Sequence, residues 1–336
     1  MKIAVFGVGG VGGYFGARLA ESGEDVAFIA RGPHLDAIRE RGLRVDSVLG
    51  DMRIEPARAS DSPVDIGPVD AVLLGVKTWQ VASVAPSLKP LLGPETFVVP
   101  LQNGVEAAAV LAAELGVEQV VGGLCGGFCF VVGPGHIKHI GGATFVKFGE
   151  LLAGIAGANP RPTAMDGGSA GIAGANPRPS ARVERLRAAF ARARVDVEVP
   201  PDIRVALWMK LMLVVPFGSV GAVARAPIGV LLTTPETRDL VERGMEEIAA
   251  VARAEGASLP ADAVAKTLAL LDGVTPSGTA SMQRDIAAGK RSELDEWTGA
   301  VARLGAKHGV PTPVHSFIYA SLLPLEQRAR GEIAFD

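Results

Sequence analysis

The chain begins with an apolar run, Met1-Lys2-Ile3-Ala4-Val5-Phe6, that leads directly into Gly7-Val8-Gly9-Gly10-Val11-Gly12. The glycines have the G-x-G-x-x-G spacing, and residues 14 to 21 follow with a helix-like pattern. A strand, a glycine-rich turn and a helix in this order are typical of a dinucleotide-binding unit. We therefore expect residues 7 to 12 to contact a dinucleotide cofactor.

Each glycine has a physical reason in that interpretation. Gly7 permits the tight turn, Gly9 lets the backbone approach a pyrophosphate, and Gly12 lets the helix pack close to the strand. The helix would then point its N-terminal N–H groups and the positive end of its dipole at the phosphates.

The rest of the N-terminal half alternates strand and helix patterns. Apolar runs typical of buried strands occupy residues 26–30, 71–76 and 96–101, and helical patterns occupy residues 35–41 and 106–115. This alternation predicts a parallel sheet with right-handed crossovers. Residues 123–149 are richer in strand patterns, with a turn at Gly133-Pro134-Gly135, and predict a β-extension of that sheet.

The pattern becomes helical after Pro200-Pro201. Asp202 can cap a long helix through Met209 to Val215, which Pro216 should kink because proline lacks an N–H and its ring clashes with the preceding turn. Further helices are predicted over residues 235–256, 260–271, 279–288, 293–308 and 316–331. The sequence thus predicts an α/β Rossmann-type domain over residues 1–199 and an all-α substrate and catalytic domain over residues 200–336.

One segment of the first domain is unusual. Residues 153–162 read AGIAGANPRP, and residues 170–179 repeat the same ten letters. Small residues with Asn-Pro and Arg-Pro steps cannot build a core, and two copies are too few for a solenoid. We interpret residues 151–180 as a surface insertion and assign it no function.

Composition excludes several classes of partner. Lys and Arg (33) nearly balance Asp and Glu (36), so the net charge of −3 favours neither nucleic acid nor an anionic membrane. No uninterrupted apolar run reaches the roughly 20 residues of a membrane span, and the first strand leaves no room for a signal peptide, so we expect a cytoplasmic protein. Cys125 and Cys129 are interpreted as small buried residues, because C-x3-C without further ligands is a poor zinc site. The five histidines form no metal-binding pattern, and no metal is expected.

Arg31 bears on the choice of cofactor. An acidic residue about 20 positions after the glycines binds the ribose 2′-OH of NAD, but here Arg31 stands 19 residues past Gly12. A planar guanidinium suits a 2′-phosphate, which favours NADP. The alternative is an exposed arginine without a role.

Three further polar residues follow or interrupt apolar runs. Lys77 and Asn103 come at the carboxyl ends of predicted parallel strands, where open α/β sheets bind ligands, although either residue could simply cap a loop. Lys210 lies alone in Leu207-Trp208-Met209-Lys210-Leu211-Met212-Leu213. If its face of the helix is buried, desolvation should lower the pKa of Lys210 towards that of a general acid. Lysines also extend routinely from apolar faces to solvent.

Six motifs in order resemble the ketopantoate reductase (2-dehydropantoate 2-reductase) family over nearly the whole chain. They are residues 7–12, Ala30-Arg31-Gly32, Val76-Lys77-Thr78, Gln102-Asn103-Gly104, Trp208-x-Lys210, and Ser281-Met282-Gln283-Arg284-Asp285-Ile286 with Glu293 twelve residues after Ser281. The resemblance implies a Rossmann domain, a C-terminal domain like that of 6-phosphogluconate dehydrogenase, and NADPH-dependent reduction of a 2-keto acid.

The same resemblance implies roles for individual residues. Arg31 would bind the 2′-phosphate, and Lys77 and Gln80 would contact cofactor phosphate and ribose groups. Asn103 would touch cofactor and substrate. In the C-terminal domain Lys210 would be the proton donor, Ser281 a ligand of the substrate carboxylate and Glu293 a partner of the nicotinamide ribose.

The chain departs from the family pattern in the substrate region. The family has asparagines four and eight residues after the lysine and ten residues further on, where this chain has Val214, Gly218 and Ile228. Arg225 or Arg284 could replace their carboxylate contacts, but each fits a surface position as well. The substrate could therefore be ketopantoate, or another 2-oxo or hydroxy acid. A non-catalytic NADPH-sensing module and a homodimer also remain open.

Overall fold

The computed structural model describes residues 1–151 and 179–335. It divides into two units. The sheet unit comprises Met1–Gln102 and Ala107–Ile203, and the helical unit comprises Asn103–Glu106 and Arg204–Asp336. The predicted insertion at 151–180 lies outside the described residues except for its ends.

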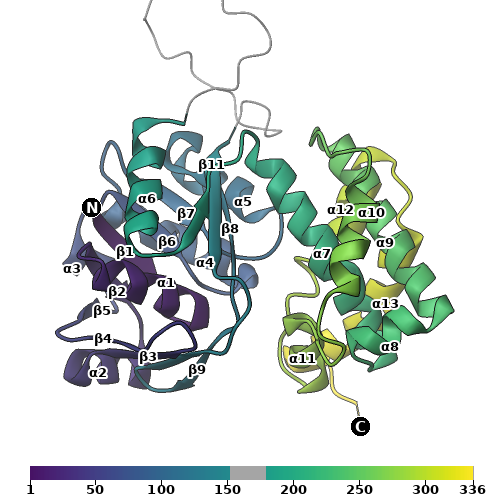
Figure 1. The fold of residues 1–336 in the computed structure, drawn as a ribbon, viewed down its shortest axis with the longest axis horizontal. Coiled ribbons are helices and arrows are strands. Elements are labelled where there is room, and N and C mark those ends of the chain that lie inside the picture. The colour runs from purple at the N-terminus through teal and green to yellow at the C-terminus, as the bar shows by residue number, and fades with distance from the viewer. Residues whose placement is uncertain (152–178, 336) are drawn as a thin grey trace, which may run out of the picture. The chain divides into compact units, whose positions relative to one another are not determined.

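The centre of the sheet unit is a five-stranded parallel sheet with the order β5-β2-β1-β6-β7 (Figure 1). Its strands are β1 (Lys2–Phe6), β2 (Asp25–Ile29), β5 (Arg58–Ser60), β6 (Ala71–Leu74) and β7 (Phe97–Pro100). The chain runs outward from β1 to β5 and then returns to β6 on the other side of β1. The strand order therefore reverses between β1 and β6, which is where open α/β sheets bind ligands. The predicted parallel sheet is confirmed.

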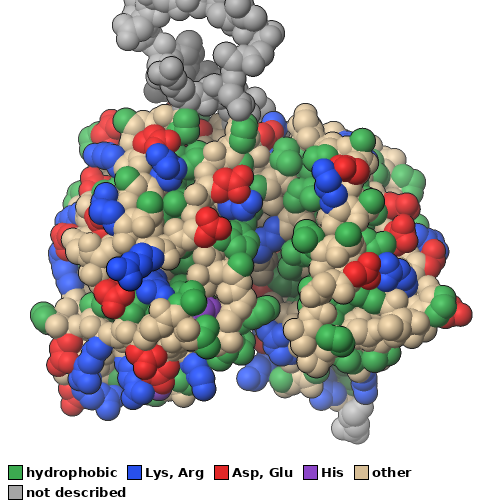
Figure 2. All heavy atoms as spheres, in the orientation of Figure 1, with side chains coloured by type: hydrophobic (Ala, Val, Ile, Leu, Met, Phe, Trp, Pro, Cys, Tyr) green, Lys and Arg blue, Asp and Glu red, His purple; other side chains and the backbone are tan. Residues whose placement is uncertain are grey.

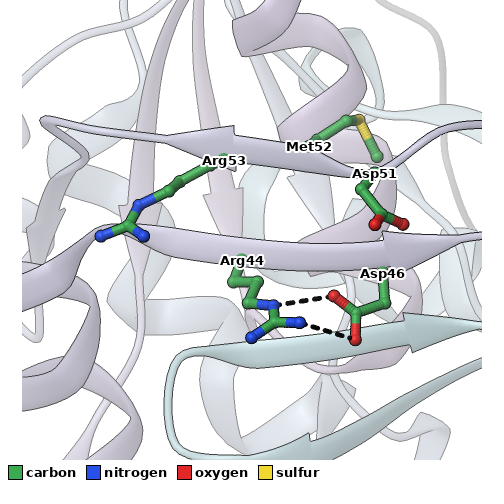
Figure 3. Close-up of a pocket in the computed structure, with 5 residues that line it drawn as sticks. All are labelled: Arg44, Asp46, Asp51, Met52 and Arg53. Atoms are coloured by element: carbon green, nitrogen blue, oxygen red, sulfur yellow. Dashed lines mark hydrogen bonds and ion pairs between the residues drawn. The ribbon is translucent and has the colours of Figure 1, made fainter.

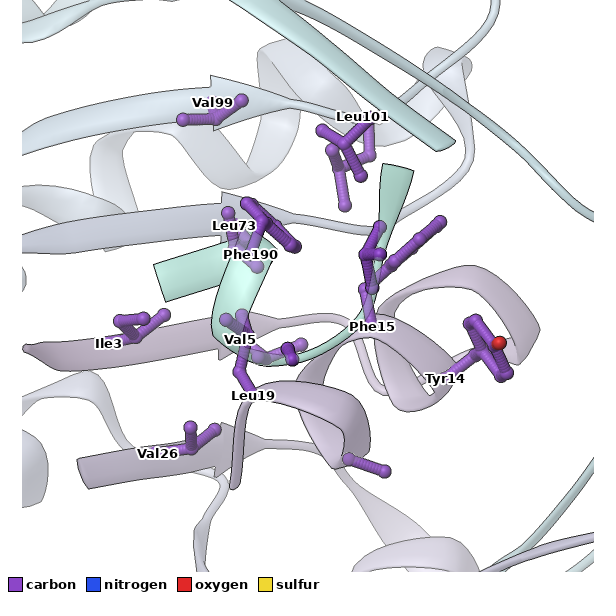
Figure 4. Packing of buried hydrophobic residues seen from close by; sticks show 14 of the residues in the cluster. Ile3, Val5, Tyr14, Phe15, Leu19, Val26, Leu73, Val99, Leu101 and Phe190 are labelled. Atoms are coloured by element: carbon purple, nitrogen blue, oxygen red, sulfur yellow. The ribbon is translucent and has the colours of Figure 1, made fainter. Parts of the chain in front are cut away.

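Helices and short 3-10 turns connect the strands. They are α1 (Gly10–Glu21), α2 (Gly32–Arg41), α3 (Pro63–Ile66), η1 (Thr78–Gln80), α4 (Val81–Val84), η2 (Ala85–Leu91), α5 (Ala107–Leu115), η3 (Val117–Gln119) and α6 (Ala181–Arg192). Ile3 and Val5 of β1 pack with Phe15 of α1 and Phe190 of α6 (Figure 4), whereas Ala4 packs in a second cluster. Both faces of the sheet are thus buried, as its uninterrupted apolar runs require.

The expected β-extension is wrong in its pairing. Strands β8 (Val121–Gly126), β9 (Cys129–Gly133), β10 (His136–His139) and β11 (Phe145–Glu150) do form in the predicted region. They belong to two separate sheets, β4-β3-β10-β9 and β12-β11-β8, because β3 (Leu43–Ser47), β4 (Met52–Ile54) and β12 (Asp196–Glu198) offer them partner edges. An isolated bridge between Val98 and Val120 links this region to β7.

The helical unit contains seven helices in the residues described. They are α7 (Ile203–Ala224), α8 (Ile228–Thr233), α9 (Pro235–Ala254), α10 (Ala263–Asp272), α11 (Ser281–Ala287), α12 (Thr298–His308) and α13 (Pro313–Ala329). Their core includes Trp208, Met245 and Trp297. The predicted all-α character of this region is confirmed.

Several helix boundaries differ from the expectation, among them that of α13, which begins at Pro313 rather than residue 316. α7 continues through Pro216 to Ala224, because residues on both sides of the proline are buried and packing outweighs the one lost hydrogen bond. α12 begins at Thr298 rather than residue 293, and the preceding residues form turns.

α7 is also long and apolar enough to cross a membrane by length and composition alone. However, 61% of its most apolar window is buried inside the structure. Trp208, Leu211, Met212 and Val215 belong to the core of the helical unit, so α7 is packed within that unit. Cationic and anionic side chains are interspersed over the visible surface (Figure 2), in keeping with the small net charge.

Candidate functional site

The glycine-rich loop connects β1 to α1 where the strand order reverses. Gly7 has φ +93°, and a Cβ there would lie 2.8 Å from Val76 Cγ1. A Cβ on Gly12 would lie 2.1 Å from the Gly7 carbonyl oxygen, and one on Gly10 equally close to the Cys129 carbonyl oxygen. These three glycines are therefore required by the packing of the protein itself.

Gly9 is different. It is the N-cap of α1, with an ordinary φ of −77°, and the nearest atom to a Cβ built there is the Gly75 carbonyl oxygen at 3.8 Å. A side chain at this position would not clash with the protein, so packing does not require a glycine here. No side chain caps the first turn of α1 either, among the residues described. A helix N-terminus without a capping side chain fits a phosphate group, so the loop fits the pyrophosphate of a dinucleotide.

Arg31 directly follows β2 and is the N-cap residue of α2. Its side chain is exposed, and it stands where an NAD-binding unit would carry an acidic residue. The nearby Asp61, at the end of β5, is paired with Arg39 at 3.5 Å. Arg31 is therefore an exposed cationic side chain at the end of β2.

Lys77 and Gln102 follow the carboxyl ends of the parallel strands β6 and β7, at the same edge of the sheet. Lys77 is exposed, and its backbone N–H donates to Gln80 Oε1 at 3.2 Å. Gln80 thus stabilises the turn that presents Lys77. Gln102, to which sequence analysis gave no role, is buried and donates from Nε2 to the carbonyls of Leu74 and Val76, both at 2.9 Å. The sequence does place Gln102 beside Asn103, in the Gln102-Asn103-Gly104 motif.

The helical unit contains the other candidate residues. Lys210 is half-buried on α7, and Ser281 is the first residue of α11. Asn103, although it follows β7 in the chain, belongs to the helical unit as well. Glu293 is buried at 5% exposure in the turns before α12. Asn103, Lys210, Ser281 and Glu293 are therefore all carried by one unit.

Side chains of α13 form hydrogen bonds with the segment that carries Glu293. Glu326 of α13 is 1% exposed, and its carboxylate accepts hydrogen bonds from Ser292 N at 3.0 Å and Ser292 Oγ at 2.6 Å. Asp295 accepts from Tyr319 at 2.8 Å and also pairs with Arg330. Sequence analysis missed this support, because nothing in the local pattern around residue 326 points to a segment more than thirty residues earlier.

Glu296 follows Asp295 in the chain, and its carboxyl group has a raised pKa. Burial, together with the negative charges of Asp295 and Glu293, raises the pKa of Glu296 to about 7. Its Oε2 atom is buried without a hydrogen-bond partner among the residues described. The carboxyl group is therefore partly protonated near neutral pH.

The three departures from the family asparagines have distinct environments. Val214 is half-buried and packs against the core of the helical unit. Ile228 is 1% exposed, at the start of α8, and is a core residue. A Cβ on Gly218 would lie 2.7 Å from Ala280 Cβ, so α7 and the residue before Ser281 are in closer contact than any larger side chain at 218 allows.

The other residues considered in the sequence have differing environments. Arg284 donates to Thr279 Oγ1 at 3.1 Å, and Arg225 is exposed at the end of α7. Cys125 is buried as expected, and Cys129 is only half-buried. Burial and the neighbouring Cys125 raise the pKa of the Cys129 thiol to about 12. No group of three potential metal ligands occurs in the described part of the chain.

A surface depression on the β3–β4 side of the sheet unit carries none of the candidate residues. It is lined by Arg44, Asp46, Asp51, Met52 and Arg53 (Figure 3). Arg44 Nε and Nη2 donate to the two carboxylate oxygens of Asp46 at 2.8 and 3.2 Å. The charges of these two residues satisfy each other, which gives the depression no evident ligand.

The parallel sheet with its glycine-rich loop, followed by an all-helical unit, is the architecture of a dinucleotide-binding protein with a second, helical unit. Comparison with known proteins makes the assignment specific. Residues 3–152 match the model of the family "Ketopantoate reductase PanE/ApbA", and residues 202–326 match that of its C-terminal domain. The chain belongs to the ketopantoate reductase family.

Individual relatives agree over the full length. A 2-dehydropantoate 2-reductase of Halobacterium salinarum is 30% identical over 330 residues, covering 98% of this chain and 99% of the relative. The crystal structure of a ketopantoate reductase family member from Ralstonia eutropha JMP134 has a TM-score of 0.82 and 32% identity, covering 98% of this chain and all of that one. A D-mandelate dehydrogenase solved with NADH shares the fold at a TM-score of 0.81, with 21% identity.

Proposed function

We propose that this oxidoreductase uses NADPH to reduce a 2-oxo acid, with ketopantoate to pantoate as the simplest reaction. The observation that carries the proposal is the glycine at position 9. The packing of the protein itself would accept a side chain there, so a bound pyrophosphate gives a reason for the glycine. The exposed Arg31 after β2 supports the 2′-phosphate form of the cofactor. Several relatives of known name are 2-dehydropantoate 2-reductases, which supports the substrate.

The residues of this chain supply binding and a proton. Bound NADPH provides the hydride. The first-turn N–H groups of α1 hold the pyrophosphate, and Lys77 and Gln80 lie at the same sheet edge to meet phosphate and ribose groups. Glu293 accepts a hydrogen bond from the nicotinamide ribose.

The substrate is held by the helical unit. Ser281 Oγ donates to the substrate carboxylate, and Asn103 donates to substrate and cofactor. Lys210, in its ammonium form, donates a proton from Nζ to the substrate oxygen on which negative charge develops. Lys210 is then left as a neutral amine that water reprotonates.

Replacement of Lys210 tests this assignment. Lys210→Ala should lower kcat for the preferred 2-oxo acid by about 100-fold or more, the size typical of a lost general acid. NADPH affinity should change by less than about threefold. Lys266→Ala is the matched control, because Lys266 is an exposed lysine of the same unit that pairs with Asp262. A Lys210→Ala enzyme that turns over every 2-oxo acid at the wild-type rate refutes the mechanism.

A second candidate function has its own observation. The face of α7 beyond Lys210 is apolar at Val214, and Gly218 is closed off by Ala280. Such a face offers no hydrogen bond to a substrate hydroxyl. A polar pocket that makes this hydrogen bond would strongly prefer substrates that carry the hydroxyl. The apolar face favours a 2-oxo acid with an apolar side chain, or the corresponding hydroxy acid oxidised in the reverse direction. D-mandelate dehydrogenase shows that the fold accommodates a hydroxy acid of that kind.

The two candidates are separated by a substrate panel and two variants. Wild-type kcat/KM should be compared for ketopantoate and for 2-oxo acids with aliphatic or aromatic side chains. If the apolar face sets the preference, Val214→Asn shifts the ratio towards ketopantoate by about tenfold. Gly218→Asn should fold poorly alone and improve when combined with Ala280→Gly. No turnover of any 2-oxo or hydroxy acid, with intact NADPH binding, would instead favour a non-catalytic sensor.

A further inference from the structure

The short segment Asn103–Glu106 belongs to the helical unit although the residues on both sides of it belong to the sheet unit. Val105 packs against the core of the helical unit. The preceding Gln102 is fixed to the end of β6 through its side-chain amide. Asn103 is therefore held by its own unit and not only by the strand that it follows.

Arg303 of α12 is the residue that makes the polar part of this attachment. Its Nη2 donates to Glu106 Oε2 at 2.8 Å, and its Nη1 donates to the carbonyl oxygen of Asp295 at 2.9 Å. Glu106 is three residues after Asn103, and Asp295 is two residues after Glu293. One guanidinium thus joins the two segments that carry Asn103 and Glu293.

The surroundings of Arg303 are built for this bridge. A Cβ on Gly299, one turn before Arg303 on α12, would lie 3.1 Å from Arg303 Nη1 and 2.8 Å from Tyr319 Cε2. Glycine at that position leaves room for both side chains. Tyr319 in turn donates to Asp295 Oδ1 at 2.8 Å, so Asp295 is held at its side chain and at its carbonyl.

We propose that Arg303 is a positioning residue of the reaction, which holds the Asn103 and Glu293 segments in one arrangement. The inference rests on the proposed function, because it assumes that Asn103 and Glu293 contact cofactor or substrate. Arg303 itself touches neither. It acts by fixing two chain segments that are 190 residues apart in sequence, so that both side chains meet the same bound molecules at once.

The expected effect is moderate, because the Arg303 and Glu106 side chains are 53% and 34% exposed. An exposed ion pair contributes little, and the hydrogen bond to a carbonyl adds to it. We expect Arg303→Ala to lower kcat/KM for the 2-oxo acid about five- to tenfold. Arg303→Lys should restore only part of the loss, because an ammonium lacks the two-pronged geometry that serves two acceptors.

The control variant is Arg238→Ala. Arg238 lies in the same unit, and its two Nη atoms donate to the Asp272 carboxylate at 2.8 and 3.1 Å. Both variants remove one partly exposed arginine ion pair, so their thermal unfolding midpoints should fall by similar amounts. Only Arg303→Ala should lower kcat/KM, and hydrogen exchange should quicken in residues 103–106 and 293–297 of that variant alone.

A double-mutant cycle with Asn103 tests the proposed route of action. In an Asn103→Ala enzyme, adding Arg303→Ala should cost less than about half of its effect in the wild type. Full additivity, or equal kcat/KM losses for Arg303→Ala and Arg238→Ala, would overturn the inference. Failure of the proposed function has a separate signature, which is the absence of wild-type turnover. In that case unchanged exchange in residues 103–106 of Arg303→Ala still refutes the bridge.

Discussion

Substitution of Gly9 separates cofactor binding from folding. At φ −77° and ψ −166° alanine is an unstrained residue, and its Cβ would make an ordinary van der Waals contact, at 3.8 Å, with the Gly75 carbonyl oxygen. Loss of chain entropy in the unfolded state would stabilise Gly9→Ala by about 0.4–1 kcal/mol, but alanine is less favourable than glycine at the N-cap of α1. The two effects offset each other, so the free energy of unfolding should stay within about 1 kcal/mol of the wild-type value.

The same methyl group stands where the pyrophosphate approaches the backbone. Displacing the phosphates from the first turn of α1 loses at least one hydrogen bond to a charged group, about 1.5–3 kcal/mol. The Kd for NADPH should rise about 10- to 150-fold. Fluorescence titration measures the affinity, and urea unfolding measures the stability.

Gly12→Ala is the contrasting variant. Its Cβ would lie 2.1 Å from the Gly7 carbonyl oxygen, so this substitution should destabilise the fold itself by about 1–3 kcal/mol or more. A Gly9→Ala protein that binds NADPH as tightly as the wild type would show that this loop does not hold the pyrophosphate. A Gly9→Ala protein that unfolds as readily as Gly12→Ala would contradict the packing argument.

Three further outcomes follow from individual residues. Arg31→Ala should raise KM for NADPH about tenfold or more and KM for NADH less than about twofold, because only the former offers a 2′-phosphate; equal losses refute the assignment. For Glu296 the folded-state pKa is raised to about 7, so stability should fall as the pH rises from about 4.5 to 7. Glu296→Gln should remove that fall, up to about 3 kcal/mol, in urea unfolding at pH 5 and pH 8. Burial opposes ionisation of Glu247, but the hydrogen bonds from His315 and from two amides of α13 nevertheless hold the Glu247 pKa below its usual value. The stability that Glu247 contributes should therefore be present above about pH 4.5 and lost on further acidification, and Glu247→Gln should abolish this acid-dependent step.

The elements that sequence could predict were those with a local signal. The strand, turn and helix at residues 2–21 were placed by glycine spacing and apolar periodicity alone, and β6 and β7 by their apolar runs. The start of α9 at Pro235 follows from proline's preference for the first helical turn.

What could not be predicted depends on contacts between distant segments. β3 and β4 carry a weak strand pattern; β3 pairs with β10, nearly a hundred residues later, and β4 pairs with β3. The turns before Thr298 look helical in the sequence, yet they are fixed by Glu326 through Ser292. Likewise, the motif that contains Asn103 gives no sign that the residue belongs to the helical unit. Local periodicity carries no information on such partners.

The proposed cofactor-binding residues and the proposed proton donor lie in different units, and this separation bears on how substrate preference could change. The proposed proton donor Lys210 and the apolar Val214 lie one helical turn apart on α7, whereas the glycine-rich loop and Arg31 belong to the sheet unit. Residues at i and i+4 share a helix face, so a change at Val214 would alter the surface beside the proposed proton donor without moving the lysine. It also leaves the proposed cofactor site untouched. A change of substrate side chain therefore requires neither a new proton donor nor a new cofactor. On the proposed mechanism, Val214 and Gly218 in place of amide side chains along α7 would alter substrate preference while the proposed reduction chemistry is retained.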